Sequence, residues 1–338
     1  MLTPCIFGCK SLILQKSERV FYKKTQPLGF ILFQRNCGNQ QQLTTLIEDL
    51  RDSVGRDAPI LIDQEGGRVQ RLRPPAWRHG VAAGIFGKLF LRDPSLALHL
   101  AHINARVTAE ELFQVGIDVN CAPVLDLQEK GGHSVIGDRA FSSDPEVVKV
   151  LGQTVLNGFA TGGVLSVIKH IPGHGRATAD SHLTLPSIDA DIKVLRKREF
   201  YPFMRIEGAV AGMTGHLLFS SLDRCNPVTF SNKIIEDVIR KYIGFSGLLI
   251  SDDLSMGALD GELGERATRA LEAGCDIALH CNADMGEMQK IAYACQSFSN
   301  ISETRIKLFL NRITDLKSNR LKIDVAKALS ELEYGIRC

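Results

Sequence analysis

The sequence predicts an α/β protein built as a (β/α)8 TIM-type barrel with a C-terminal helical tail. Short apolar runs recur eight times along the 338 residues. Most are continuously apolar, as in strands buried on both faces of a parallel sheet, and segments with helical periodicity separate them. About 250 residues are typical of this barrel, which tolerates insertions. An open doubly wound sheet is the alternative, but no Gly-x-Gly-x-x-Gly motif follows an early strand.

Eight strands are expected in chain order, each followed by a loop or a helix. They cover residues 4–7, 29–33, 59–62, 117–121, 164–168, 210–213, 247–250 and 275–279. No linker and no internal repeat interrupts the alternation of strands and helices. We therefore expect residues 1–338 to form a single catalytic barrel domain, with no second domain.

Four segments between the strands carry apolar residues at the spacing of one helix face. They cover residues 97–113, 199–209, 232–242 and 264–273. In the first, the apolar stripe consists of Leu98, Ala101, Val107 and Leu112. The helical tail after the last strand has a similar stripe, formed by Ile306, Phe309, Leu310, Ile313 and Leu316.

Composition and charge exclude several classes of function. Charged residues make up 23% of the chain and the formal net charge is +2, which gives no field for nucleic acid or an anionic membrane. No stretch approaches about 20 uninterrupted apolar residues, and residues 1–14 lack the features of a secretory signal. Nine cysteines without Cys-x-x-Cys spacing indicate reduced thiols. We expect a cytoplasmic monomer that binds neither nucleic acid nor membrane.

The stretch from Lys169 to His182 is the strongest candidate for a functional loop. It begins at the end of the fifth expected strand and holds a lysine, three histidines, a carboxylate and two glycines. Pro172, Gly173 and Gly175 prevent regular structure for long. Polar loops on a rigid scaffold commonly carry catalytic groups, so we interpret the chain as an enzyme.

Polar side chains also follow the other expected strands. Barrel enzymes place their chemistry at the carboxyl ends of the strands, so these groups should converge on one rim. They are Arg35 and Asn36, residues 63–71, Asp126, His216, Asp252 and Asp253, and His280 with Asn282. Taken singly, Arg35, Asp126, His216 and Asp253 are interpreted as helix caps or ion-pair partners. Taken together, the groups favour a site.

Two chemistries compete for the loop. One is a metal site made of His170, His174 and His182 with Asp180, but the spacing matches no known ligand pattern and Lys169 would repel a cation. No metal and no cofactor are therefore expected. In the other chemistry, Asp180 orients His182 as a general acid and base that works near neutral pH. A carboxylate at the seventh strand would then act as nucleophile.

Four segments of the chain resemble the family 3 glycoside hydrolases, and in particular the short bacterial β-N-acetylglucosaminidases of the NagZ type. The segments occur in the same order as in that family. The segments are residues 62–71, 135–141, 169–182 and 250–256. The chain departs from common family residues at Ile171, Arg176 and Gly215. Arg176 is interpreted as a solvated loop arginine, with contact to an acidic peptide of the substrate as the alternative.

By position, the resemblance implies roles for individual residues. Asp252 is implied to be the nucleophile that forms a covalent glycosyl-enzyme, His182 the acid/base and Asp180 its dyad partner, while Asp253 keeps a structural role. A retaining glycosidase needs its nucleophile and acid/base about 5 Å apart. The residues implied to hold the terminal N-acetylglucosamine (GlcNAc) are Asp63, Arg71, Arg139, Lys169 and His170.

The resemblance implies a retaining exo-β-N-acetylhexosaminidase. Its substrate would be a saccharide, GlcNAc linked β-1,4 to 1,6-anhydro-N-acetylmuramic acid (anhydroMurNAc) with or without peptide, as in peptidoglycan recycling. One alternative is a phosphorylase on the same scaffold, because a neutral imidazole does not repel phosphate. Two others are a metal-dependent hydrolase and a non-catalytic sugar-binding sensor. The retained Asp180, His182 and Asp252 disfavour a sensor.

Overall fold

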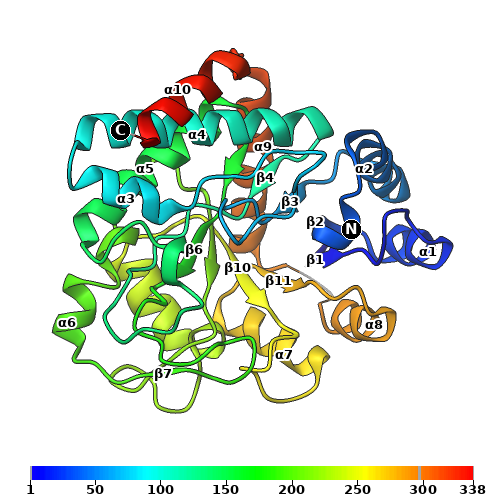
Figure 1. Ribbon diagram of the computed structural model, residues 1–338. Helices are drawn as coiled ribbons and strands as arrows, with labels where there is room; N and C mark the ends of the chain where they lie inside the picture. Colours follow the sequence, from blue (N-terminus) through cyan, green and yellow to red (C-terminus); the bar gives the residue numbers. More distant parts are fainter. Residues whose placement is uncertain (1, 296–297, 338) are drawn as a thin grey trace.

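The computed structural model describes residues 2–295 and 298–337 (Figure 1). Its strands are β1 (Thr3–Gly8), β2 (Pro27–Leu32), β3 (Ile60–Ile62), β4 (Val119–Asn120), β5 (Leu165–Ser166), β6 (Ile168–Ile171), β7 (Ser187–Ile188), β8 (Ala211–Thr214), β9 (Leu218–Phe219), β10 (Leu248–Asp253) and β11 (Ile277–His280). β7 and β9 form a separate small sheet. The other nine belong to one parallel sheet.

The large sheet closes into a barrel. Its strand order is β5-β4-β3-β2-β1-β11-β10-β8-β6. β5 and β6 stand at opposite ends of this order, yet Val167 alone separates them in the chain. They are therefore one interrupted strand, and the barrel has eight strand positions. This confirms the predicted fold class, and each of the eight predicted apolar runs overlaps a strand.

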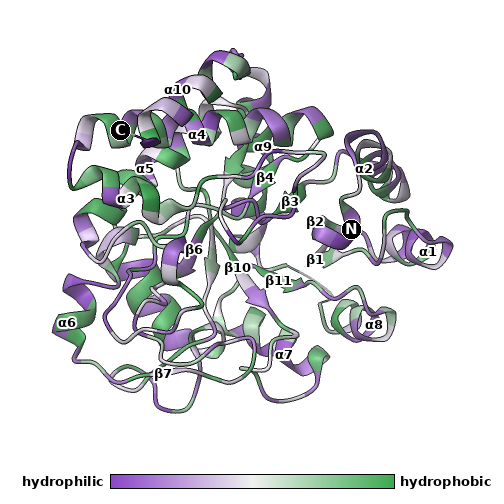
Figure 2. Cartoon of the chain, in the orientation of Figure 1, coloured by the Kyte–Doolittle hydropathy of each residue, from purple (hydrophilic) through white to green (hydrophobic). Residues whose placement is uncertain are grey.

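Helices surround the barrel, as Figure 1 shows. They are α1 (Lys16–Thr25), α2 (Gln40–Val54), α3 (Ala83–Phe90), α4 (Pro94–Val115), α5 (Pro145–Thr161), α6 (Ile192–Lys197), η5 (Ile234–Tyr242), α7 (Leu263–Ala273), α8 (Met285–Ala294), α9 (Asn300–Ser318) and α10 (Val325–Arg337). Hydrophilic and hydrophobic residues alternate along them (Figure 2). In α2, for example, Leu43, Leu46, Ile47 and Leu50 are buried at helical spacing. None of the described helices is long and apolar enough to span a bilayer.

Three of the four predicted helices are confirmed, and the prediction over 199–209 is wrong. The structure has a short helical turn at Tyr201–Phe203 there, followed by irregular chain. Pro202 lacks the amide hydrogen that an α-helix needs and restricts the residue before it. Arg205 and Gly208 then adopt left-handed backbone angles, with φ of 55° and 74°, which a helix cannot contain.

The predicted C-terminal tail is part of the barrel core. Its buried stripe, Ile306, Phe309, Ile313 and Leu316, packs with inward-facing strand residues, whereas Leu310 is only partly buried. Polar contacts hold α9 at the amino ends of the strands. Arg305 lies 3.0 Å from Asp276, just before β11, and Lys317 lies 2.5 Å from Asp118, just before β4. α9 thus covers the end of the barrel opposite the strand ends that carry the predicted site.

Candidate active site

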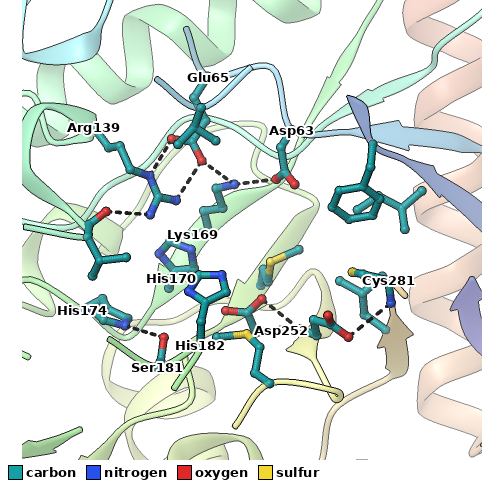
Figure 3. A pocket seen from close by; sticks show the side chains of 18 of the residues that line it. Asp63, Glu65, Arg139, Lys169, His170, His174, Ser181, His182, Asp252 and Cys281 are labelled. Carbon is teal, nitrogen blue, oxygen red and sulfur yellow. Dashed lines mark hydrogen bonds and ion pairs between the residues drawn. The ribbon is translucent and has the colours of Figure 1, made fainter. Parts of the chain in front are cut away.

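The carboxyl ends of the strands surround a cavity of about 400 Å³, seen from close by in Figure 3. Every residue to which the family resemblance assigned catalysis or sugar binding lines this cavity. They are Asp63, Arg71, Arg139, Lys169, His170, Asp180, His182 and Asp252. Asn36, Asp126, His216 and His280, also expected at this rim, do not line it. The barrel thus brings together side chains from four distant segments of the chain.

A cluster of alternating charges forms one wall of the cavity (Figure 3). The ammonium of Lys169 lies 2.7 Å from an oxygen of Asp63 and 2.7 Å from an oxygen of Glu65. Arg139 donates two hydrogen bonds of 2.8 Å to the Glu65 carboxylate, in fork-to-fork geometry. Arg71 donates one of 3.0 Å to Asp63. Two carboxylates and three cations therefore fix one another in place.

These ion pairs keep the buried groups charged. Burial alone would lower the pKa of Lys169, but Asp63 and Glu65 raise it above the ordinary lysine value. Burial alone would raise the pKa of Glu65, but Arg139 and Lys169 lower it to about 2. The same balance, with Lys169 and Arg71, holds the pKa of Asp63 well below its usual range. At neutral pH this wall offers fixed charges for hydroxyl groups to bind.

Sequence reasoning missed Glu65, although it lies within a segment that carried the family resemblance. Its side chain joins Lys169, in β6, and Arg139, in the short helical turn Gly137–Arg139. A carboxylate two residues after Asp63 could have been paired with one of the predicted cations. The pairing itself depends on contacts between loops that are more than 70 residues apart along the chain.

His170 is oriented by a buried carboxylate. Its Nδ1 atom lies 2.6 Å from Oδ2 of Asp126, and Asp126 also accepts the backbone amide of His174 at 2.7 Å. Asp126 was expected to cap a helix, and that prediction is wrong. It instead fixes the imidazole of His170 and the start of the loop that follows.

Asp252 lies at the end of β10, and its carboxylate accepts the amide of Asp253 at 2.8 Å. Burial alone would raise the pKa of Asp252, but His216, His170 and the Asp253 amide hold it below the ordinary value. Among the described residues, His216 neither caps a helix nor belongs to an ion pair, in contrast to the prediction. Its Nε2 donates to the Asp253 carbonyl at 3.0 Å, and its Nδ1 accepts from the Thr229 hydroxyl at 2.8 Å.

The carboxylate of Asp253, unlike that of Asp252, accepts hydrogen bonds from the turn that follows it and from the end of β11. It accepts the amide and the hydroxyl of Ser255, at 3.1 and 2.7 Å, and the amide of Cys281 at 3.2 Å. The expectation of a helix cap is wrong, because Asp253 holds a turn and the next helix, α7, has Glu262 at its N-cap. Arg35 is not ion-paired in the described residues. It donates to the carbonyls of Cys9 and Cys281, and so joins the ends of β1 and β11.

His182 projects into the mouth of the cavity beside Asp252 (Figure 3). Its Nδ1 atom lies 2.7 Å from Oδ1 of Asp180, so the carboxylate holds the proton on Nδ1 and leaves Nε2 for chemistry. The His182 side chain is 63% exposed and that of Asp180 25%. Burial alone would raise the pKa of Asp180, but the amide and imidazole of His182 hold it below its ordinary value.

Arg176 is not a solvated loop arginine, so that interpretation of it is wrong, whereas its contact with a substrate peptide stays a prediction. Its Nε lies 2.7 Å from Glu199, which is fully buried, and its Nη2 lies 3.3 Å from Glu129. Arg198 pairs with the same Glu129 at 2.6 Å. Burial raises the pKa of Glu199 above the usual glutamate value. Arg176 thus fastens the base of the loop that carries His182.

The three loop histidines do not converge. His170 faces Asp126, His182 faces Asp180, and the Nε2 of His174 lies 3.1 Å from the Ser181 hydroxyl. Burial lowers the pKa of His174 to about 4, so this ring is neutral at pH 7. The described residues contain no group of three or more His, Cys, Asp or Glu side chains that could hold a metal ion.

Comparisons with known proteins identify the family of the chain. Residues 13–316 match the glycosyl hydrolase family 3 N-terminal domain. The chain is 39% identical over 286 residues to the β-hexosaminidase of Alkalilimnicola ehrlichii, covering 83% of this chain and 81% of that protein. The solved structure of NagZ from Neisseria gonorrhoeae in complex with N-trifluoroacetyl-D-glucosamine matches with a TM-score of 0.87 and 31% identity, over 99% of this chain and 98% of that chain.

A longer enzyme is also similar. The family 3 β-N-acetylglucosaminidase from Paenibacillus sp. str. FPU-7 matches with a TM-score of 0.84 and 28% identity, and the match covers 98% of this chain and 66% of that chain. Together the matches confirm the resemblance and the expected enzyme class, a glycoside hydrolase of the β-hexosaminidase type. The chain belongs to glycosyl hydrolase family 3.

Proposed function

We propose that this protein is a retaining exo-β-N-acetylglucosaminidase with Asp252 as nucleophile and the pair Asp180 and His182 as acid/base. The observation that carries the proposal is the position of Asp252 and His182 side by side at one cavity. The carboxyl has a lowered pKa and the imidazole is oriented by a second carboxylate. A nucleophile and a proton donor on one cavity are what a two-step glycosidase requires.

In the first step, a carboxylate oxygen of Asp252 attacks the anomeric carbon and the glycosidic bond breaks. The Nε2 proton of a protonated His182 passes to the leaving oxygen, so the aglycone departs as an alcohol. In the second step, His182 Nε2 takes a proton from water while the water oxygen attacks the anomeric carbon. The bond to Asp252 breaks and GlcNAc is released with its original configuration. Asp180 holds Nδ1–H throughout.

The charged wall suits a single terminal sugar. Asp63 accepts hydrogen bonds from hydroxyl groups, and Lys169, Arg71, Arg139 and His170 donate them. The cavity volume of about 400 Å³ is near the lower end for small-molecule pockets. This favours one sugar residue over an internal segment of a chain. We therefore assign these five residues to binding of the non-reducing GlcNAc.

The proposed substrate is GlcNAc linked β-1,4 to anhydroMurNAc, with or without a peptide, and the proposed setting is peptidoglycan recycling in the cytoplasm. Similarity to a NagZ that was crystallised with an N-acylated glucosamine supports the sugar. The small net charge supports a saccharide partner without nucleic acid or membrane. We further propose a monomer whose barrel supplies the whole catalytic apparatus, because the eight site residues all line one cavity of that barrel.

A covalent trap tests this proposal directly. A fluorinated GlcNAc analogue with a good leaving group should inactivate the enzyme and add one sugar mass. Peptide mass spectrometry should then locate the label on Asp252. A label on another residue, or none in an active enzyme, would remove Asp252 as the nucleophile.

A further inference from the structure

The turn that follows Asp252 binds the backbone of the segment that carries His182. The amide of Gly257 donates to the His182 carbonyl at 3.0 Å, and the amide of Ala258 donates to the Ser181 carbonyl at 3.2 Å. Two successive amides of one turn thus hold two successive carbonyls of the loop. The contact joins the two segments that carry the proposed nucleophile and the proposed acid/base.

The turn is itself fixed to the end of β10. Asp253 accepts the amide and hydroxyl of Ser255 through its carboxylate, and its carbonyl accepts the amide of Met256 at 3.1 Å. Gly257 therefore stands at a defined position relative to Asp252, which precedes Asp253 directly. A loop docked on Gly257 takes its place from the same strand end that positions the nucleophile.

Residue 257 tolerates no side chain while the loop is docked. A Cβ added there would lie 2.7 Å from the Leu183 carbonyl oxygen and 3.0 Å from the His182 carbonyl oxygen. These are backbone atoms, and they cannot rotate away as the end of a side chain can. The φ of Gly257 lies outside the left-handed region that favours glycine. An alanine at 257 therefore has an ordinary φ, and the three nearest atoms that its Cβ would meet all belong to the loop.

We propose that Gly257 is a positioning residue for His182. It contacts neither the sugar nor the reacting atoms. Its amide holds the loop, and its missing side chain lets the loop approach, so that the imidazole reaches the leaving oxygen. This inference rests on the proposed role of His182 as the acid.

The test compares Gly257→Ala with wild-type enzyme on a series of aryl N-acetylglucosaminides whose leaving phenols differ in pKa. A phenol of low pKa departs without a proton, whereas one of high pKa needs the acid. We expect kcat/KM of Gly257→Ala to be close to wild type for the best leaving groups and about tenfold or more lower for the poorest. A structural fault would lower kcat/KM by the same factor for every substrate.

Gly286→Ala is the matched control. It places a methyl group near the start of α8, where the nearest atom is a side-chain oxygen of Asp284 at 3.3 Å. It should leave the dependence on the leaving group unchanged. If Gly257→Ala lowers kcat/KM equally for all substrates, or does not lower it, the inference is overturned.

Two further results separate this inference from the proposed function. If His182→Ala shows a steep dependence on the leaving group and Gly257→Ala does not, only the role of Gly257 fails. If His182→Ala shows none, the role of His182 fails and the inference with it. Should Gly257→Ala not fold, amide hydrogen exchange of the wild-type enzyme decides. Protected amides at Gly257 and Ala258 support docking, and rapid exchange there in the folded protein contradicts it.

Discussion

Nδ1 of His182 lies 2.7 Å from Oδ1 of Asp180, and the same oxygen accepts the His182 backbone amide at 2.9 Å. One carboxylate oxygen thus fixes both the ring and the backbone of the residue two positions later. Both residues belong to the same loop, so Asp180 sets the tautomer of His182 in any position that the loop takes. What the barrel adds is the place of this pair beside Asp252.

Replacement of His182 should depend on the substrate. We expect His182→Ala to lower kcat/KM on the natural disaccharide by about 10²- to 10⁴-fold, the usual contribution of a general acid, and to spare p-nitrophenyl N-acetylglucosaminide. Asp180→Asn should act in the same direction with a smaller effect, because the imidazole remains. Steady-state kinetics on both substrates provide the measurement. Equal losses on the two substrates would exclude His182 as the acid.

The two adjacent aspartates should behave differently. Asp252→Asn should reduce turnover to below about a thousandth of wild type, because an amide cannot form the glycosyl-enzyme. Asp253→Asn keeps an oxygen that can accept the Ser255 amide, so the fluorinated sugar should still label this variant. Its melting temperature should fall instead, because Asp253 holds the turn. Turnover and melting temperature together distinguish them. A fully active, normally stable Asp252→Asn enzyme would reverse the assignment.

Glu65 should make stability sensitive to acid. Its pKa of about 2 in the folded protein is below the ordinary value of about 4.3, so the folded state binds this proton less tightly than the unfolded state does. The resulting contribution, about 3 kcal/mol, is present above the unfolded pKa and is lost as pH falls through the folded one. Urea unfolding from pH 5 to about pH 2 should show this loss, and Glu65→Gln should show less of it.

Glu262→Gln is the control for Glu65. Glu262 also pairs with a lysine, at 2.6 Å, but its side chain is 77% exposed, so its replacement should change the unfolding midpoint little. At neutral pH, Glu65→Gln should lower stability by roughly 3–5 kcal/mol, because Lys169 and Arg139 lose their shared partner. Similar small effects in both variants would show that the charged wall adds little to stability.

Arg176 should stabilise the protein through Glu199. Arg176→Met leaves the buried Glu199 without its closest cation and should cost roughly 2 kcal/mol, less than a fully buried pair because Arg176 is partly exposed. Adding Glu199→Gln should recover most of the loss, since no buried charge then stays unpaired. A double-mutant cycle from urea unfolding measures this coupling. Strictly additive effects would contradict the pairing.

The barrel could be predicted because buried parallel strands are continuously apolar. Each predicted run, such as 164–168, falls on a strand, and the site residues follow the strands where a barrel brings them together. The family resemblance added the roles, which no local pattern supplies. The prediction over 199–209 is wrong because Pro202, which lacks an amide hydrogen, interrupts a segment whose apolar residues have helical spacing.

The contacts that orient the site could not be read from the chain. Asp126 has the local pattern of a cap, and its partner His170 is 44 residues away. Glu65 meets Arg139 across 74 residues. Arg176 lies in a polar, glycine-containing loop, which gives no sign of the buried Glu199 below it. α9 looked like a tail because its apolar stripe does not show that it fills the end of the barrel.

The anomeric configuration of the first product tests the central claim most directly. Proton NMR should follow hydrolysis of a β-N-acetylglucosaminide in phosphate buffer before the released sugar mutarotates. A covalent intermediate on Asp252 predicts that β-GlcNAc appears first. Transfer of the sugar from this intermediate to water predicts that GlcNAc 1-phosphate does not form. GlcNAc 1-phosphate would identify a phosphorylase, and α-GlcNAc as the first product would contradict the two-step mechanism.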